Sequence, residues 1–250
     1  MHPSLVVIKF GGTSLASPAR LRQAARRVRN HLRQTEVVVV ASALGHATDR
    51  ILAWVGRLEI PAGVAAREID RALATGETLS TSLLAAAIRV LNLPAKGLSG
   101  GEAGIEANGP FGAGSITGVN PSPIRRLLRN GVTPVVAGFQ GRRPDGETVT
   151  LGRGSSDTSA VALAAALGSV PCHLVTDVAA VHDRDPNLDP AARPCPELSH
   201  AELLRLAENG AQVVHAEAAR LSLAHRVPLF IYSYRSPFRG SHGTAVSSAP

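Results

Sequence analysis

Short apolar runs alternate along the chain with longer segments in which apolar residues recur at helical spacing. The runs at residues 4–10 and 37–41 are almost continuously apolar, which is typical of strands buried on both faces of a sheet. Between these two runs, Ser17 and Pro18 stand in the order of a helix N-cap and a first helical residue. The repeated order of strand and helix predicts an α/β fold with a mostly parallel sheet that helices cover on both faces.

The same pattern predicts the remaining elements. The other expected strands are residues 94–98, 133–138, 148–151, 173–176 and 228–233, the last of these preceding a closing segment at 243–246. The expected helices are residues 48–56, 64–75, 79–91, 121–130, 156–167 and 200–209, and one that ends at 224. Ser199 and Glu202 have the spacing of a capping box. Residues 100–120 are rich in glycine and predict either a surface loop or a small hairpin.

Residues 148–167 carry the clearest functional pattern, because a short strand passes through a glycine turn at 152–154 into an apolar helix. Ser156 or Asp157 can cap this helix, whose first N–H groups and dipole form a site for phosphate or carboxylate. Arg153 adds a fork that binds carboxylates bidentately. A tight turn before a buried helix is the alternative, and this stretch alone leaves both open. It is not the dinucleotide fingerprint, and the chain has no P-loop motif.

A second candidate phosphate cradle follows the first strand, where Lys9 leads into Gly11 and Gly12. Lysine and arginine number 26, but the only lysines are Lys9 and Lys96. A lysine at a glycine turn, in a chain whose other cations are arginine, indicates a need for a compact ammonium. A solvated lysine at a strand end is the alternative. Glu77, which precedes an expected helix, is interpreted as favouring the helix dipole.

Composition and charge narrow the class of partner. The 250 residues are 44% hydrophobic and 18% charged, which suits one large α/β domain. The net charge of +7 indicates an anionic partner, and the arginines of residues 20–33 are expected on a solvated helix face. Only 3% of residues are aromatic and no nucleic-acid-binding module is present, so a small phosphorylated ligand fits better than a nucleic acid.

Cysteine usage and the first residues indicate the cellular setting. Cys172 and Cys195 lack the spacing of a metal site or a disulfide framework. The first apolar run is a strand that Lys9 interrupts, not a signal peptide, and no apolar run is long enough to cross a membrane. We therefore expect a soluble, cytoplasmic protein with no membrane partner.

Several motifs follow one another in a familiar order. They are KFGGTS at 9–14, SALG at 42–45, GETLS at 76–80, GFQG at 138–141, TLGRGSSD at 150–157, TDV at 176–178, DP at 185–186, ELLRLAENGAQVVH at 202–215 and GTAV at 243–246. This ordered set resembles the catalytic domain of the aspartokinases, within the amino-acid-kinase superfamily. The resemblance covers essentially the whole chain, and the set is far more specific than any one motif.

The resemblance implies a three-layer αβα sandwich around a mostly parallel sheet, the carbamate-kinase-like fold. It also implies ATP-dependent phosphorylation of the side-chain carboxylate of L-aspartate to 4-phospho-L-aspartate, with release of ADP. That reaction is the first step of aspartate-family biosynthesis, which leads to lysine, threonine and methionine. Mg²⁺ would be carried by the ATP phosphates, without a metal site on the protein.

The resemblance assigns roles to the residues above. Lys9 would stabilise the transferring phosphoryl group, and Asp157 would hold Lys9 in position. Glu77 would receive the substrate ammonium. The expected ATP- and phosphate-binding residues are Lys9, Phe10, Gly11, Gly12, Ser42, Gly45, Thr176, Asp177, His182, Arg184 and Gln212. The expected substrate-binding residues are Thr13, Ala47, Glu77, Phe139, Arg153, Gly154, Ser155 and Ser156.

Four positions depart from the family pattern. They are Ala47 in place of a substrate-contacting threonine, Ser155 in place of a glycine, Asn187 in place of an arginine and Gln212 in place of a lysine. Thr48 is adjacent to the first of these. Loss of a cation from a phosphoryl-transfer site lowers the rate unless Arg184 or another residue replaces it.

Typical aspartokinases continue into paired ACT domains. This chain ends at Pro250, so we expect one catalytic domain over residues 1–250, without an ACT domain, and a homodimer formed through the kinase domain. Two alternatives remain: a kinase of the same fold for another carboxylate, which Ala47 motivates, and a catalytically weak ligand-binding paralogue, which Asn187 and Gln212 motivate. Retention of four residues, Lys9, Asp157, Arg153 and Glu77, argues against the weak paralogue.

Overall fold

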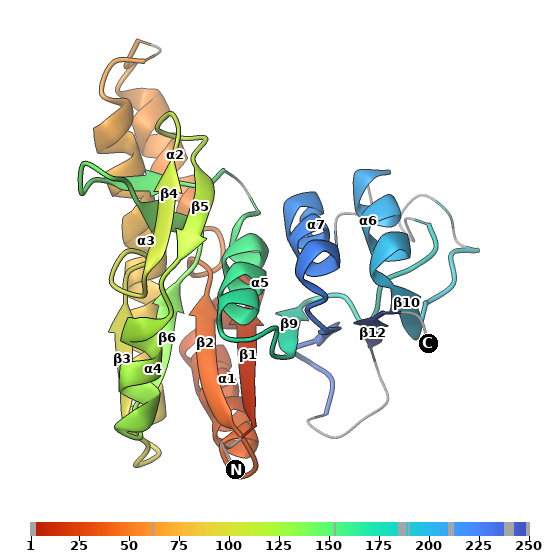
Figure 1. Cartoon of the computed structure of the whole chain (residues 1–250). Helices are drawn as coiled ribbons and strands as arrows, with labels where there is room; N and C mark the ends of the chain where they lie inside the picture. Colours follow the sequence, from red (N-terminus) through yellow and green to blue (C-terminus); the bar gives the residue numbers. More distant parts are fainter. Residues whose placement is uncertain are drawn as a thin grey trace.

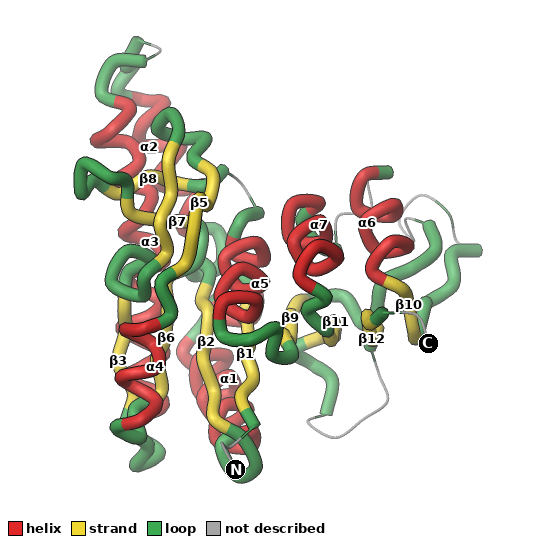
Figure 2. The backbone as a smooth tube through the Cα atoms, viewed as in Figure 1, coloured by secondary structure: helices red, strands yellow, loops and turns green. Residues whose placement is uncertain are grey.

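The computed structural model of the chain describes residues 4–61, 63–152, 154–184, 189, 191–209, 213–237 and 243–248. Within these residues, the central sheet has eight strands in the order β10-β12-β11-β9-β1-β2-β6-β3 (Figure 1, Figure 2). Neighbouring strands are parallel except for the antiparallel pair β11 and β12, so the predicted mostly parallel sheet is confirmed. The strands are β1 Leu5–Phe10, β2 Glu36–Ala41, β3 Ala95–Leu98, β6 Thr133–Ala137, β9 Cys172–Thr176, β10 Glu197–Ser199, β11 Leu229–Ser233 and β12 Thr244–Ser247.

Helices cover both faces of this sheet. One apolar cluster joins Ile8 and Phe10 of β1 to helices α1 and α3, and another joins Val7 of β1 to α4, α5, α6 and α7. Because successive strand residues face opposite sides, a continuous apolar run supplies both clusters, and the predicted αβα layers are confirmed. No helix in the described part of the chain is long and apolar enough to span a bilayer. The helices are α1 Pro18–His31, α2 Ala47–Arg57, α3 Ala66–Arg89, α4 Ser122–Arg129, α5 Ser156–Ala166, α6 His200–Glu208 and α7 Ala216–His225.

A second, smaller sheet lies beside α2 and α3 (Figure 1). Its order is β5-β4-β7-β8, with strands β4 Ile105–Asn108, β5 Ser115–Val119, β7 Gln140–Arg142 and β8 Thr148–Thr150. Strands β4 and β5 form the small hairpin that was one of two alternatives for residues 100–120. The strand before the glycine turn, β8, pairs antiparallel with β7 in this sheet. It is therefore not part of a parallel strand–helix unit.

Two strands at the far edge of the central sheet differ from the prediction. β10 has three residues, too few to give a hydrophobic pattern. The strand at 228–233 is not the last, because β12 forms within the closing segment and pairs with both β10 and β11.

The prediction of two helices at 64–75 and 79–91 is wrong. A single helix, α3, continues through Gly76 and Glu77. Gly76 suggests a break in the sequence, but here it permits close approach: a Cβ at this position would lie 3.0 Å from the Cβ of Ala43. One turn further on, the Ser80 hydroxyl donates a 2.6 Å hydrogen bond to the carbonyl oxygen of Ser42. The glycine therefore seats α3 against the turn that follows β2.

Two of the three predicted helix caps agree with the structure and one differs. Ser17 caps α1, and Ser199 opens α6 with a complete capping box. At α5 the prediction is wrong, because neither Ser156 nor Asp157 is the N-cap. Ser155 occupies the N-cap position and makes no side-chain capping bond. Asp157 instead lies in the first helical turn, where its carboxylate is available for another contact.

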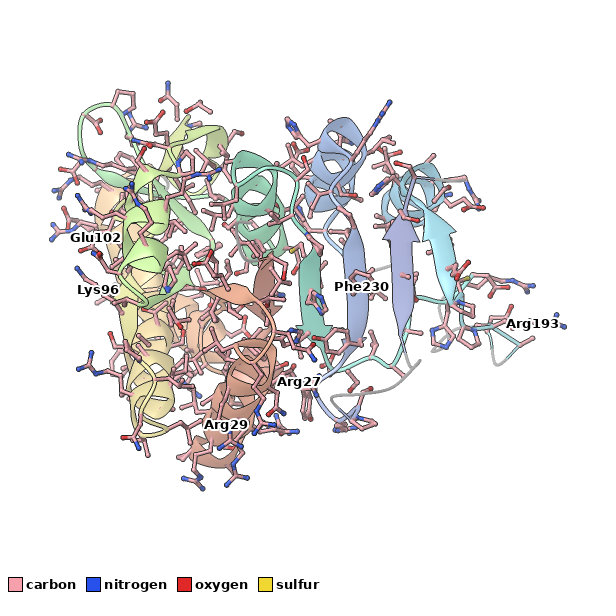
Figure 3. The ribbon with its side chains drawn as sticks, turned by 60° about the horizontal axis from the view of Figure 1, so that its bottom comes forward. Arg27, Arg29, Lys96, Glu102, Arg193 and Phe230 are labelled. Carbon is pink, nitrogen blue, oxygen red and sulfur yellow. The ribbon has the colours of Figure 1, made fainter. Side chains whose placement is uncertain are left out.

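Arg27 is an exception to the predicted solvated arginine face of α1. It is buried, and its guanidinium carbon lies 5.1 Å from the centroid of the Tyr232 ring. It also donates a 2.7 Å hydrogen bond to the carbonyl oxygen of Ser236. Figure 3 shows Arg27 and Arg29 extending from α1. Aromatic side chains of β11 far along the sequence thus bury a cation that the local pattern places in solvent.

Asp70 joins α3 to the small sheet. Its Oδ2 accepts hydrogen bonds from the N–H groups of Thr150 at 2.7 Å and Gly112 at 3.0 Å, and its Oδ1 accepts one from the Thr150 hydroxyl at 2.9 Å. Asp70 is only 1% exposed, so these bonds are shielded from water. The carboxylate therefore fixes β8, and with it the start of the glycine turn.

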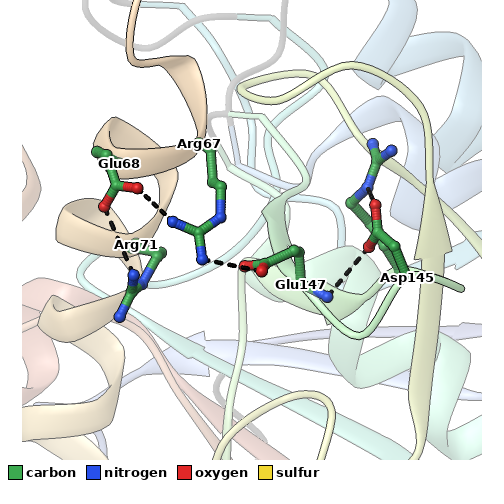
Figure 4. A network of polar contacts seen from close by, with 6 residues as sticks. Arg67, Glu68, Arg71, Asp145 and Glu147 are labelled. Atoms are coloured by element: carbon green, nitrogen blue, oxygen red, sulfur yellow. Dashed lines mark hydrogen bonds and ion pairs between the residues drawn. The ribbon is translucent and has the colours of Figure 1, made fainter.

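Ion pairs at the surface join the same two parts of the molecule (Figure 4). Arg67 of α3 contacts Glu147, just before β8, with 2.8 Å between Nη2 and Oε1. Arg67 also pairs with Glu68, which pairs in turn with Arg71 at 3.5 Å. These side chains are a third or more exposed, so each pair contributes about 0–1 kcal/mol.

We predict that Asp70→Ala lowers the free energy of unfolding by about 3–5 kcal/mol, because two buried donors of Thr150 and the Gly112 N–H lose their acceptor. Asp70→Asn should cost less, since its amide oxygen still accepts the two N–H bonds. Glu147→Gln, which removes only a surface ion pair, should cost less than about 1 kcal/mol. Urea unfolding followed by circular dichroism measures all three. An Asp70→Ala variant within 1 kcal/mol of wild type would contradict this role.

Candidate active site

A cavity of about 240 Å³ opens at the carboxyl edge of the central sheet, where the turns after β1 and β2 meet the start of α5. Ligand sites in open α/β sheets lie at this edge. Nine of the sequence-predicted site residues line the cavity, together with three others. The lining residues are Lys9, Gly12, Ser42, Ala43, Gly45, Thr48, Asp49, Glu77, Phe139, Gly154, Ser156 and Asp157.

The ion pair of Lys9 and Asp157 lies at one side of the cavity. Lys9 Nζ is 2.6 Å from Asp157 Oδ1, and each side chain is 12% exposed. Lys9 comes from the end of β1 and Asp157 from the first turn of α5. The Asp157 Oδ2 atom accepts a long, 3.5 Å hydrogen bond from the N–H of His215. The pair therefore presents an oriented ammonium group beside the glycine turn that follows β1.

The glycine turn beside Lys9 is packed too closely for any side chain at its centre. A Cβ on Gly12 would lie 2.8 Å from the carbonyl oxygen of Ala43 and 2.9 Å from that of Gly45. The Gly45 N–H donates to Gly12 at 2.9 Å, and the Gly11 N–H donates to Val175 of β9 at 3.0 Å. Backbone groups of three strand ends are thus fixed around one small volume.

Glu77 is a buried carboxyl with one unused oxygen. It is 3% exposed, and its Oε1 accepts a 3.1 Å hydrogen bond from the N–H of Ala43. Its buried Oε2 has no hydrogen-bond partner among the described residues. Burial raises the pKa of Glu77 to about 7, against the smaller lowering effect of its backbone hydrogen bonds. A cation in the cavity would offset the cost of burying the ionised carboxylate, so Glu77 is suited to bind an ammonium group. The interpretation of Glu77 as a group at a helix start is wrong, because it lies inside α3.

Phe139 and Ser156 also line this cavity. Phe139 adopts a left-handed backbone with φ of 66°, held by a 3.1 Å hydrogen bond from its N–H to the Ser159 hydroxyl. A Cβ on Gly138 would lie 2.9 Å from the Cβ of Ser156, so the glycine lets α5 approach β6. Phe139, with this unusual backbone, lines both this cavity and a second one.

The second cavity, of about 350 Å³, is mostly apolar and shares Thr48 and Phe139 with the first. It lies between α2, α3 and the small sheet. α2 contributes to it without burying any of its own residues. The lining residues are Thr48, Leu52, Ala66, Ile69, Asp70, Leu73, Phe111, Gly112, Phe139, Thr150 and Gly152. The site therefore has an apolar extension next to its polar part.

Sequence reasoning missed three lining residues, namely Ala43, Thr48 and Asp49. Thr48, not Ala47, lines the cavity, because α2 begins at Ala47 and its second residue turns inward. The adjacent threonine is visible in the sequence, but only the helix start decides which of the two residues lines the cavity. Ala43 contributes a backbone N–H, which no side-chain pattern reveals.

Other predicted site residues do not line this cavity. Phe10 is buried in the core, and the Ser155 hydroxyl donates to the carbonyl oxygens of Leu151 and Gly152, which stabilises the turn. The remaining predicted residues outside the cavity lining are Gly11, Thr13, Ala47, Thr176, Asp177, His182 and Arg184. The predicted residues Arg153 and Gln212, the Asp-Pro pair at 185–186 and Asn187 lie outside the described residues.

Several of the residues predicted to bind ATP lie at the end of β9 and in the segment that follows it. Thr176 ends β9, and its hydroxyl donates to the carboxylate of Asp177 at 3.2 Å. Arg184 pairs with Asp189 at 2.6 Å and is 61% exposed. This contact is an exposed surface ion pair, which contributes about 0–1 kcal/mol. In the part of the chain that the structure describes, no group of three or more His, Cys, Asp or Glu residues could hold a metal ion.

Comparison with known proteins adds to this geometry. Residues 4–233 match the sequence model of the amino acid kinase family. An aspartokinase from Thermus thermophilus is 39% identical over 244 residues, which make up 97% of this chain and 59% of that protein. The chain therefore spans little more than half the length of this relative.

Solved structures share the fold. An aspartate kinase from Synechocystis aligns with a TM-score of 0.83 and 37% identity, over 99% of this chain and 40% of that one. The E. coli aspartokinase III complex with aspartate and ADP aligns with a TM-score of 0.86 and 25% identity, over 99% of this chain and 65% of that one. The predicted amino-acid-kinase fold is confirmed. Because the sequence match, the αβα layers and the cavity at the carboxyl edge agree, the chain belongs to the amino acid kinase family.

Proposed function

We propose that this chain is the catalytic part of an aspartokinase, which transfers the γ-phosphoryl group of ATP to the side-chain carboxylate of L-aspartate. The observation that carries the proposal is one cavity that contains both the Lys9–Asp157 ion pair and a buried Glu77 oxygen that has no hydrogen-bond partner among the described residues. The first suits a phosphoryl group and the second suits an ammonium group. An acidic amino acid and a nucleoside triphosphate together satisfy both. The similarity to aspartokinases supports this assignment.

Phosphoryl transfer needs positioning and charge neutralisation more than covalent chemistry. An oxygen of the aspartate side chain attacks the γ-phosphorus, the bond to the β,γ-bridging oxygen breaks, and ADP leaves with that oxygen. Lys9 offers its ammonium to the equatorial oxygens, where charge is spread in the transition state. Asp157 keeps the ammonium aimed at this place. No covalent enzyme intermediate is required.

Recognition of the acceptor would divide between the two sides of the cavity. The aspartate ammonium pairs with Glu77, which then ionises, and the α-carboxylate binds Ser156 together with Arg153. The Phe139 ring separates this polar site from the apolar cavity. Thr48 replaces Ala47 in the proposed substrate-binding set, for the reason given above.

The nucleotide would lie along the carboxyl ends of β1 and β9, against Thr176 and Asp177. The other members of the sequence-predicted ATP-binding set remain part of this proposal. Mg²⁺ would arrive on the ATP phosphates, as is general for kinases. The proposed setting is a cytoplasmic homodimer in the pathway to lysine, threonine and methionine, with the described kinase fold as a single catalytic domain.

A second candidate is a kinase of the same fold whose acceptor carries an apolar substituent. The apolar cavity favours this candidate, because it adjoins the acceptor site through Thr48 and Phe139 and offers about 350 Å³. L-aspartate itself has no apolar group to place there. An aspartate with an added alkyl group would bury apolar surface in this space.

The test is to incubate the purified protein with Mg-ATP, hydroxylamine and a panel of acceptors, and to measure hydroxamate. The panel contains L-aspartate, 3-methylaspartate, L-glutamate and succinate. The proposal predicts aspartyl hydroxamate as the main product. Preference for 3-methylaspartate would favour the second candidate, whereas ATP binding without any hydroxamate would refute both.

We predict that Lys9→Ala lowers kcat about 1,000-fold or more, because the ammonium acts on charge that develops in the transition state. Asp157→Asn should lower kcat about 100-fold through loss of that orientation. The matched controls are Lys96→Ala, at an exposed residue of β3 (Figure 3), and Asp145→Asn, at an exposed turn residue (Figure 4). Hydroxamate formation gives the rates, and circular dichroism checks folding. A rate near wild type in either site variant would refute the catalytic assignment.

We also predict that kcat/KM for aspartate rises with pH through about 7 and then levels off, since ammonium binding requires ionised Glu77. The direction follows from the raised pKa, which leaves Glu77 protonated and uncharged below that pH. Glu77→Gln should lower kcat/KM about 100-fold and abolish this step. Glu106→Gln, at an exposed glutamate of β4, should retain the wild-type profile. The same step in Glu77→Gln would exclude Glu77 as its source.

A further inference from the structure

The turn that follows β1 has an external support. This turn, residues Gly12–Leu15, leads into α1, and Gly12 lines the candidate active site. Arg20 of α1 donates a 2.5 Å hydrogen bond from Nη1 to the carbonyl oxygen of Thr13. In the same peptide unit, the Ser14 N–H donates to the carbonyl oxygen of Gly11 at 3.0 Å. The peptide between residues 13 and 14 is therefore held at both its carbonyl and its amide end.

Arg20 is in turn held by Tyr234, which follows β11. The Arg20 guanidinium carbon lies 4.7 Å from the centroid of the Tyr234 ring, within the range of a cation–π contact. The next residue along the chain, Arg235, also contacts this ring: its guanidinium carbon lies 5.3 Å from the ring centroid, and its Nε donates a 3.1 Å hydrogen bond to the Tyr234 hydroxyl. The ring therefore contacts two guanidinium groups.

Tyr234 itself has little freedom to move. It is 8% exposed, and its N–H donates a 2.8 Å hydrogen bond to the carbonyl oxygen of Thr176, the last residue of β9. Its own carbonyl oxygen accepts a 2.8 Å hydrogen bond from the side-chain amide of Gln23 in α1. A rigid path of contacts thus runs from the end of β9, through Tyr234 and Arg20, to the turn beside Lys9.

We propose that Arg20, braced by the Tyr234 ring, is a positioning residue that fixes the Gly12–Leu15 turn for phosphoryl transfer. The guanidinium bonds the Thr13 carbonyl oxygen and so fixes the orientation of this peptide. It also adds positive charge behind the turn. Arg20 touches no reacting atom and acts through the backbone of the turn. The inference rests on the proposed phosphotransferase function, and its structural part is tested separately.

The first test measures backbone amide exchange with deuterium in the unliganded protein, for the segment that contains residues 11–15. Arg20→Ala and Tyr234→Leu should speed this exchange about 10-fold, because the peptide loses its outer anchor. Tyr234→Phe, which keeps the ring, and Arg22→Ala, at an exposed arginine of α1, should match wild type. Exchange at wild-type rate in a folded Arg20→Ala variant would overturn the inference, whatever the acceptor.

The second test separates positioning from general stability in the hydroxamate assay. Arg20→Ala should lower kcat about 10- to 100-fold, while KM for aspartate stays within about twofold. Millimolar guanidinium should restore part of that loss in Arg20→Ala but give no gain in Arg22→Ala or in wild type. An unchanged kcat in Arg20→Ala would overturn the inference. A wild-type protein that turns over no acceptor would contradict the proposed function, and amide exchange would still decide the role of Arg20.

Discussion

The ion pair between Lys9 and Asp157 is the contact on which the candidate site depends. It joins the end of β1 to the first turn of α5 across 2.6 Å, with both side chains largely shielded from water. Burying an ammonium group costs free energy unless a counter-ion pairs with it. A carboxylate in the first turn of a helix can be that counter-ion, because the helix dipole also favours a negative charge there. Helix α5 must therefore begin close to the end of β1, which the turn stabilised by the Ser155 hydroxyl makes possible.

Close backbone approach at glycines brings the other parts of the site to this pair. Gly12 lets the turn after β1 contact the turn after β2, Gly76 lets α3 contact Ala43, and Gly138 lets α5 contact the end of β6. An added Cβ would clash at Gly12 and Gly138, and at Gly76 it would force Ala43 to shift slightly. One result is that Glu77 lines the cavity with one oxygen bonded and the other without a partner in the described part of the chain. The same packing that forms the fold thus leaves one polar group whose partner would be a ligand.

Much of the fold can be predicted from the sequence because its signals are local. Apolar runs mark the buried parallel strands, and the capping box at Ser199 marks α6. The errors arise where distant residues decide. Gly76 suggests a helix break until Ala43 is seen against it, and the helix start at α2 selects Thr48 for the cavity. Asp70 has partners 42 and 80 residues away, so no local pattern identifies it.

The most direct test of the central claim is a double-mutant cycle of Lys9→Ala and Asp157→Asn, with kcat for acyl phosphate formation as the readout. If Asp157 acts by orienting Lys9, then Asp157→Asn should hardly change kcat in a protein that already carries Lys9→Ala. The account therefore predicts that the double variant is about as slow as Lys9→Ala alone. A double variant slowed by the product of the two single effects would show that Asp157 acts independently, and would contradict the account.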